Sequence, residues 1–260
     1  MLMKEQAPFE IYRNQEIKRK INFKRLLLII FFLCIITVIP IIKGPFFNIE
    51  NIEIAGNESI SKKEILRCVS QYYGKNLLVV KQDVVKNAIM QKFPIKEVQV
   101  KHKLPNTLSI NIKEREIVAA LNYLNGFVLI DCQGVIVKKV SRLESYSIPI
   151  ITGLTISDAK VAKQPSIDKN SSEHYKKVLT CIKHLTQIMP ELSEIHLDFV
   201  SQQQPEISLY TLDGYEILLG NADEKKMDYI KDLLEDIRTN DRGKGVLDMS
   251  CDIPVFKPFE

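Results

Sequence analysis

The longest apolar run in the chain extends from Leu26 to Ile42 and contains no charged side chain. An α-helix rises about 1.5 Å per residue, so a helix over this run is about 26 Å long, slightly less than the ~30 Å hydrocarbon core of a bilayer. Phe23, Phe46 and Phe47 extend the apolar surface at both ends. The pattern therefore predicts one membrane-spanning helix, which we place at residues 26–43.

Charged residues around the span predict its orientation. Only Lys43 stands close after it. Shortly before it stand Arg13, Lys18, Arg19, Lys20, Lys24 and Arg25. Basic residues favour the cytoplasmic side of a span. We therefore expect residues 1–25 to form a cytoplasmic stub and the rest of the chain to lie outside the cytoplasmic membrane, either in a periplasm or beneath a thick wall.

A cleaved signal peptide and a buried core helix are the alternatives to a permanent anchor. The apolar part of a signal peptide is typically about 7 to 15 residues long and ends in a small-residue cleavage site. Here the run ends in Pro40, Ile41, Ile42 and Lys43. A core helix is disfavoured by the basic flank and by apolar residues on every side. The pattern thus favours an uncleaved anchor.

After the span, residues 46–116 show the order strand, helix, helix, strand, strand. A strand is predicted over Asn48–Ala55, and Ser61 with Glu64 has the spacing of a helix capping box. A second helix is expected from Asp83 until Pro94 stops it.

Apolar and polar residues then alternate on both sides of a turn at Pro105 and Asn106. This alternation predicts a hairpin over residues 97–113, and His102 falls in its apolar register, where a structural role is favoured over metal binding. One sheet face covered by two amphipathic helices would close a small α+β domain.

Residues 117–260 predict a larger domain with a mixed or antiparallel sheet and two packed helices. Helical periodicity covers 171–189 and 221–239, and the segment 157–170 is polar and is expected to be a surface loop. Asp213 and Gly214 join two strands in a hairpin. The strands are expected at 118–123, 127–130, 135–140, 148–151, 195–200, 207–212, 215–219 and 246–249. The overall fold class is therefore α+β.

Composition limits the partners and the chemistry. The net charge of +4 arises largely before the span, so the outer part is close to neutral and offers no basic stripe for nucleic acid. The five cysteines include no C-x-x-C pair. Free thiols are favoured over a Cys132–Cys251 disulfide, which stays the alternative.

Several segments together resemble one family. The runs FNIENIEIAGNESISKKEIL, NLLVV and IKEVQVKHKLPNTLSINIKERE, after one basic-flanked span, are similar to the POTRA domain of the bacterial FtsQ/DivIB cell division proteins. Later segments resemble that family's "lid-x-x-G" (residues 127–134), its "LP-x-x-x-G" (148–153) and its terminal strand (246–249). The family often has Pro where Ile117 stands, which leaves the position of the interdomain link open.

The resemblance implies a non-enzymatic divisome scaffold that links other division membrane proteins to septal wall synthesis. It implies partners of the FtsB/DivIC and FtsL type and a septal penicillin-binding protein, and localisation at the division septum. A transport or chaperone module of POTRA type is an alternative, but such proteins carry repeated POTRA units or a barrel, and this chain has one unit.

A membrane-anchored cell-wall enzyme is the other alternative. S-x-x-K matches start at Ser59 and Ser166, but no K-T-G follows them. His174, His184 and His196 have no metal-binding spacing, and turn or strand-end positions explain Asp131 and Asp248. We therefore expect no catalytic residue, no metal site and no cofactor.

The candidate partner-binding residues are those of the predicted final strand. An unpaired sheet edge can bind a partner segment through backbone hydrogen bonds. Pro254 and Pro258 in the tail cannot donate to a ladder and would limit self-pairing. The resemblance supports the same place, because the family's partner docks near its terminal strand. An internal strand capped by the tail is the alternative. The candidates are Val246, Leu247, Asp248, Met249 and Ser250.

Overall fold

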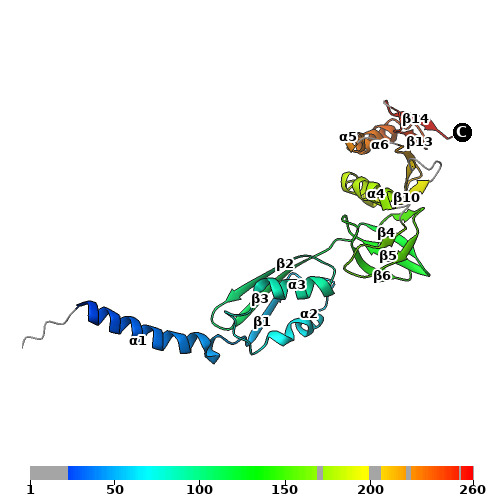
Figure 1. Ribbon diagram of the computed structural model, residues 1–260. Helices are drawn as coiled ribbons and strands as arrows, with labels where there is room; N and C mark the ends of the chain where they lie inside the picture. Colours follow the sequence, from blue (N-terminus) through cyan, green and yellow to red (C-terminus); the bar gives the residue numbers. More distant parts are fainter. Residues whose placement is uncertain (1–22, 169–171, 199–205, 221–223, 252, 260) are drawn as a thin grey trace, which may run out of the picture.

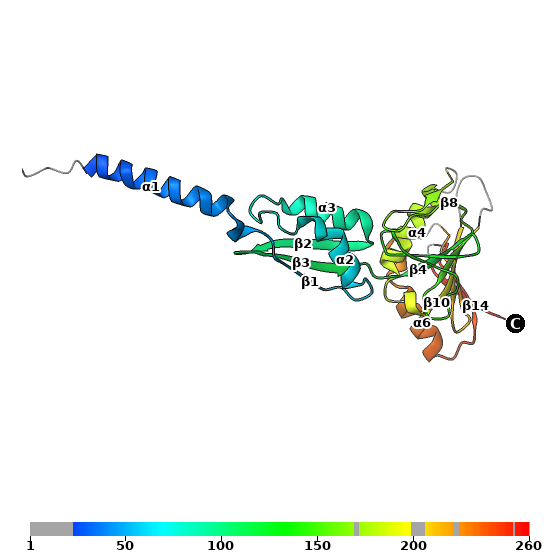
Figure 2. The same ribbon diagram turned by 90° about the horizontal axis from the view of Figure 1, so that it is seen from below.

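The computed structural model describes residues 23–168, 172–198, 206–220, 224–251 and 253–259. Figure 1 shows a long helix followed by two compact domains, and Figure 2 shows the same order from below. The predicted cytoplasmic stub, up to residue 22, lies outside the described residues.

Helix α1 (Phe23–Lys43) contains the predicted span and is long and apolar enough to cross a membrane. It starts three residues earlier than predicted, because Phe23 and two basic residues continue the helix, and Pro40 lies inside it. None of its side chains is buried in the protein. A short 3-10 turn, η1 (Pro45–Phe47), connects it to the first domain.

The first domain has the predicted strand and helix order. Its elements are β1 (Asn51–Ala55), α2 (Lys62–Val69), η2 (Ser70–Tyr72), α3 (Gln82–Lys92), β2 (Ile95–Lys103) and β3 (Thr107–Glu114). The sheet order is β1-β3-β2, with β1 parallel to β3 and the β2–β3 hairpin antiparallel as predicted. Alternate residues such as Ile54 and Ile110 point to α2 and α3, which cover one sheet face (Figure 2).

The predicted capping box at Ser61 is wrong. Ser61 does occupy the N-cap position of α2, but its side chain makes no capping hydrogen bond. The Glu114 carboxylate accepts hydrogen bonds from the backbone N–H groups of Glu58, Ser59 and Ile60 instead. A carboxylate from β3 thus satisfies the loop before α2, which spacing along one helix does not reveal.

The second domain is built on a nine-stranded mixed sheet, β14-β13-β12-β11-β10-β7-β4-β5-β6. The strands are β4 (Ala119–Tyr123), β5 (Gly126–Ile130), β6 (Ile136–Val140), β7 (Ile150–Thr152), β10 (Leu192–Asp198), β11 (Glu206–Thr211), β12 (Glu216–Leu218), β13 (Gly245–Asp248) and β14 (Val255–Pro258). Residues 199 and 200 of one predicted strand lie outside the described residues.

Helices pack on one face of this sheet. They are α4 (Ser172–His184), α5 (Glu224–Met227) and α6 (Ile230–Thr239), with the 3-10 turn η4 (Met189–Glu191). Val178 and Leu234 of the helices are buried in one hydrophobic cluster with Ile195 and Leu209 of the sheet. The predicted helix over 221–239 is divided into α5 and α6, and residues 221–223 lie outside the described residues.

The predicted surface loop over 157–170 is partly wrong. β8 (Ile156–Asp158) and β9 (Ser166–Ile167) pair as a small antiparallel ladder within it. The ladder is only a few residues long and mostly exposed, so alternation along the sequence is too short to detect. All five cysteines are free thiols, and Cys181 is buried in the core.

Candidate partner-binding site

The predicted partner-binding segment is not the final strand of the sheet. β13 contains Val246, Leu247 and Asp248, and it pairs with β12 on one side and with β14 on the other. The interpretation of residues 246–249 as an unpaired edge is therefore wrong. The tail that was expected only to limit self-pairing forms the edge strand itself.

The tail forms β14 because its residues alternate between the two sheet faces. Phe256 points to the core side, where its ring centroid lies 6.4 Å from that of Tyr215. Val255 and Lys257 point to the opposite face. Gly245 lets β14 approach closely, because a Cβ atom there would lie 2.2 Å from the Lys257 carbonyl oxygen.

The hydrogen-bond register of β14 defines what its outer side offers. The N–H of Phe259 donates to the Lys244 carbonyl at 2.8 Å, and Lys257 is paired with Val246. Bonding direction alternates along an antiparallel strand, so the backbone groups of Phe256 and Pro258 point away from β13. Pro258 lacks an N–H, which leaves the Phe256 N–H as the outward donor of this strand. Within the described residues, no strand pairs with that outer side.

Pairing across the sheet places two rows of side chains on the face opposite the helices. The first row is Ile150, Glu194, Tyr210, Glu216, Val246 and Lys257. The second row is Thr152, His196, Ser208, Leu218, Asp248 and Val255. Val246 and Asp248, predicted for binding, thus belong to an open sheet face that ends at β14. Leu247 and Met249 are buried in the core, with 2% and 0% exposure.

Asp248 is held by its neighbours on this face. Its carboxylate accepts hydrogen bonds from the Ser250 hydroxyl at 2.5 Å and the Ser250 N–H at 3.0 Å, and Lys257 Nζ lies 3.5 Å away. These Ser250 hydrogen bonds and the lysine charge lower the pKa of Asp248 below its ordinary value. Ser250, the last predicted binding residue, therefore fixes the end of β13.

A polar cluster occupies the other end of the open face. The Thr152 hydroxyl donates to Glu194 at 2.5 Å and lies 2.7 Å from His196 Nδ1. The Tyr210 hydroxyl donates to Glu216 at 3.2 Å. Desolvation, and then the charges of Glu216 and its acidic neighbours, raise the pKa of Tyr210. This end of the open face therefore carries acidic side chains and groups that can donate or accept hydrogen bonds.

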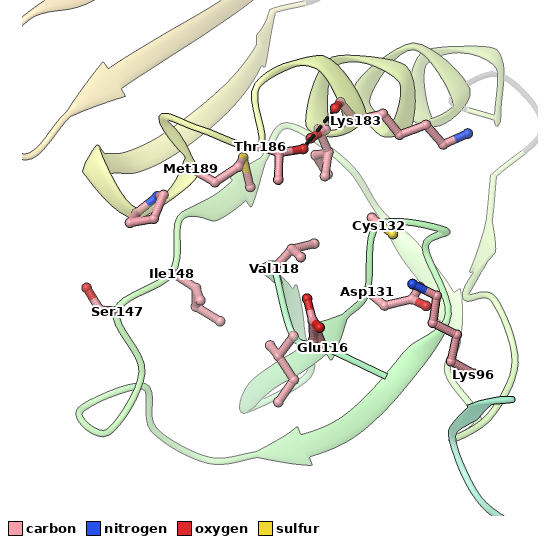
Figure 3. A pocket seen from close by; sticks show the side chains of 13 residues that line it. Lys96, Glu116, Val118, Asp131, Cys132, Ser147, Ile148, Lys183, Thr186 and Met189 are labelled. Atoms are coloured by element: carbon pink, nitrogen blue, oxygen red, sulfur yellow. Dashed lines mark hydrogen bonds between the residues drawn. The ribbon is translucent and has the colours of Figure 1, made fainter. Parts of the chain in front are cut away.

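A cavity of about 410 Å³ lies in the second domain, and Lys96 and Glu116 of the first domain reach its lining. Figure 3 shows Thr186 and Met189 from the α4 side and Val118 and Cys132 from the sheet side around it. The Asp131 carboxylate lies at the cavity wall and is bound by Arg115 and by the backbone N–H of Val135. These contacts give the carboxylate a structural role.

Ser59 and Ser166, the serines considered as possible nucleophiles, lie apart in the fold. Ser59 lies in the loop that binds Glu114, and Ser166 lies in β9. Lys169, the second lysine, is outside the described residues.

The signal that the sequence reasoning missed is the alternation of Val255, Phe256 and Lys257. Two prolines flank it, and prolines are typical of edge strands as well as of tails. An aromatic residue between two outward positions was the available sign that the tail packs on the core.

Fold and surface together define a class of protein. Its members have one apolar helix long enough to cross a membrane, a POTRA-type first domain and a mixed-sheet second domain that ends in an open edge. Family models match both domains: the FtsQ-type POTRA domain over residues 47–115 and the C-terminal domain of cell division protein FtsQ/DivIB over residues 119–250. The chain belongs to the FtsQ/DivIB family of cell division proteins.

Similar proteins carry the same description. Cell division protein DivIB of Clostridium botulinum (strain Hall) is 28% identical over 247 residues, covering 92% of this chain and 93% of the relative. Cell division protein FtsQ of Geotalea daltonii is 28% identical, covering 75% of this chain and 69% of the relative.

A solved structure of the major extracytoplasmic domain of DivIB (trans isomer) from Geobacillus stearothermophilus is 17% identical with a TM-score of 0.30. The match covers 50% of this chain and 97% of that one.

Proposed function

We propose that this chain is a non-enzymatic divisome scaffold that binds other division membrane proteins outside the cytoplasmic membrane and links them to septal wall synthesis. α1 is its single span, with residues 1–25 in the cytoplasm and the two domains, at 46–116 and 117–260, on the outer side at the division septum. Membership of a cell division family supports this role.

The observation that carries the proposal is the open edge at β14. A partner segment in extended conformation adds to the sheet by bonding to the outward Phe256 N–H and to the outward carbonyl groups of β14. Its side chains then lie beside Val255 and Lys257, with Val246 and Asp248 one strand further in. Leu247 and Met249 support the strand from the core.

The proposed partner at this edge is of the FtsB/DivIC type, with FtsL in the same complex and a septal penicillin-binding protein as a further member. Support comes from the family resemblance of the terminal strand region. A hydrolysed substrate has less support, because the Asp131 carboxylate is bound by Arg115 and by backbone N–H groups.

The test replaces one backbone donor. Phe256→Pro removes the outward N–H and leaves the inward bonds of Val255 and Lys257 in place. Phe256→Leu is the matched control, because it also removes the ring but keeps the N–H. Capture of the FtsB/DivIC-type partner by the full chain in detergent should fall at least about tenfold for Phe256→Pro relative to Phe256→Leu.

Circular dichroism must show the same folded spectrum for both variants. Equal capture by the two folded variants would rule out docking along β14.

A further inference from the structure

Large apolar side chains are exposed at the end of the first domain that faces α1. Val79 is 76% exposed and Leu104 is 65% exposed. We call these residues and their neighbours the apolar rim: Phe46, Leu78, Val79, Val84 and Leu104. Water is an unfavourable environment for so many apolar groups at one end of a small domain.

Hydrogen bonds fix the loop before α3 to the end of the span. The Asn76 side-chain N–H donates to the Ile42 carbonyl of α1 at 2.6 Å, and its oxygen accepts from the Leu78 N–H at 3.0 Å. The Leu77 N–H donates to the Phe47 carbonyl at 2.7 Å. The loop that carries Leu78 and Val79 is therefore held at the position where α1 ends.

The tip of the β2–β3 hairpin lies at the same end. The Asn106 carbonyl accepts hydrogen bonds from the backbone N–H groups of Glu50 and Asn51, at the start of β1. This places Leu104 close to the connection between α1 and β1. Figures 1 and 2 both show the hairpin tip at the end of the domain nearest α1.

A groove beside the loop combines apolar walls with positive charge. It has a volume of about 470 Å³, and its lining includes Val79 and Val84 together with Lys75 and Lys81. Lipids at a membrane surface present phosphate groups above apolar chains, and lysine side chains reach such phosphates while their stems stay in apolar surroundings.

We propose that the apolar rim rests in the interfacial layer of the membrane, with Lys75 and Lys81 at the level of the lipid phosphates. The surface that contacts lipid then extends from α1 onto the adjoining end of the first domain. It rests on the membrane anchoring in the proposed function but does not depend on partner binding at β14.

The chain contains no tryptophan, so single introduced tryptophans report position without background. Three variants of the full chain are reconstituted into vesicles of phosphatidylcholine and phosphatidylglycerol with brominated acyl chains. Val79→Trp tests the rim. Leu212→Trp, at a side chain 66% exposed in the second domain, is the matched control. Phe31→Trp, within α1, reports insertion of the span.

Bromine should quench Val79→Trp at least roughly threefold more than Leu212→Trp, and Phe31→Trp should be quenched most. Equal quenching of Val79→Trp and Leu212→Trp, with Phe31→Trp quenched, would overturn the lipid contact and leave the anchor intact. A blue-shifted but unquenched Val79→Trp would overturn it in favour of a protein contact. An unquenched Phe31→Trp would overturn the span, and the rim contact with it.

Discussion

Asp131 is a buried carboxylate whose partners come from both domains. Arg115, at the end of the first domain, binds it in an ion pair in which both side chains are largely buried. The N–H groups of Gln133 and Val135 donate to its other oxygen at 3.0 and 2.8 Å. Removing one partner of a buried ion pair destabilises a fold, because it leaves a buried charge without its counter-ion.

We expect Asp131→Asn to lower the free energy of unfolding by about 3 kcal/mol, because it leaves the Arg115 charge buried without its counter-ion. Urea unfolding followed by circular dichroism measures this. The double variant Arg115→Gln with Asp131→Asn should cost less than the sum of the two single variants. Additive costs would show that the pair is not coupled.

Glu114 makes the stability of the first domain depend on pH. Burial raises its pKa, but the N–H donors of Ile60, Glu58 and Ser59 outweigh burial and lower the pKa below its ordinary value of 4.5. A carboxyl group whose pKa is lower in the folded chain stabilises the fold above its unfolded pKa. That contribution is lost as pH falls through the folded-state pKa.

The melting temperature of the first domain should therefore fall as pH is lowered from about 5, and Glu114→Gln should flatten this dependence. Glu53→Gln is the control, because Glu53 is an exposed acid on β1 that pairs with Lys103. Thermal unfolding at several pH values measures both. Parallel pH curves for the wild-type chain and Glu114→Gln would contradict the assignment.

At the scale of elements, the turn between β5 and β6 depends on Gly134. Gly134 has φ +75°, and a Cβ atom there would lie 2.5 Å from the Tyr175 hydroxyl and 2.8 Å from a Leu179 methyl group. Gly243 has a similar φ of +77° but open space around it. A side chain at either position would strain the backbone to a similar degree, because both have positive φ. Only at Gly134 would it also clash with packed neighbours.

We expect Gly243→Ala to destabilise the second domain by about 1 kcal/mol from backbone strain. Gly134→Ala should cost about 3 kcal/mol, because α4 must also move away from the turn. Chemical unfolding of the two variants gives the difference. Equal losses of unfolding free energy in the two variants would show that α4 can shift to accommodate the added methyl group without cost.

Elements with a long, clear periodicity could be predicted from the sequence, and short ones could not. The β2–β3 hairpin alternates over many residues, and α1 lacks charge over its apolar centre, so local pattern suffices for both. β14 has only four residues, with Pro254 just before it and Pro258 as its last residue. Its pairing is set by contact with β13 and Tyr215, and the alternation of Val255, Phe256 and Lys257 is too short to predict these contacts without the fold. The candidate site moved by one strand for this reason.

At the scale of the molecule, two separate hydrophobic cores follow one another along the chain. One contains Leu77, Val85 and Leu108 in the first domain, and the other contains Val128, Ile195 and Leu234 in the second. Separate cores favour separate cooperative units. A fragment of residues 46–116 should therefore fold alone and unfold cooperatively in urea, with near-ultraviolet circular dichroism. A fragment without that signal would show that the first domain needs the second.

The hydrogen bond from Asn76 to the end of α1 also has a geometric meaning. It leaves little slack between the span and the first domain, and the second domain is attached at the opposite end of that domain (Figure 1). With α1 in the membrane as proposed, the first domain acts as a spacer that sets the height of β14 above the bilayer. Under the proposed docking at β14, a partner anchored in the same membrane has to carry its docking strand at that height, so the length of the partner's own stalk becomes part of the recognition.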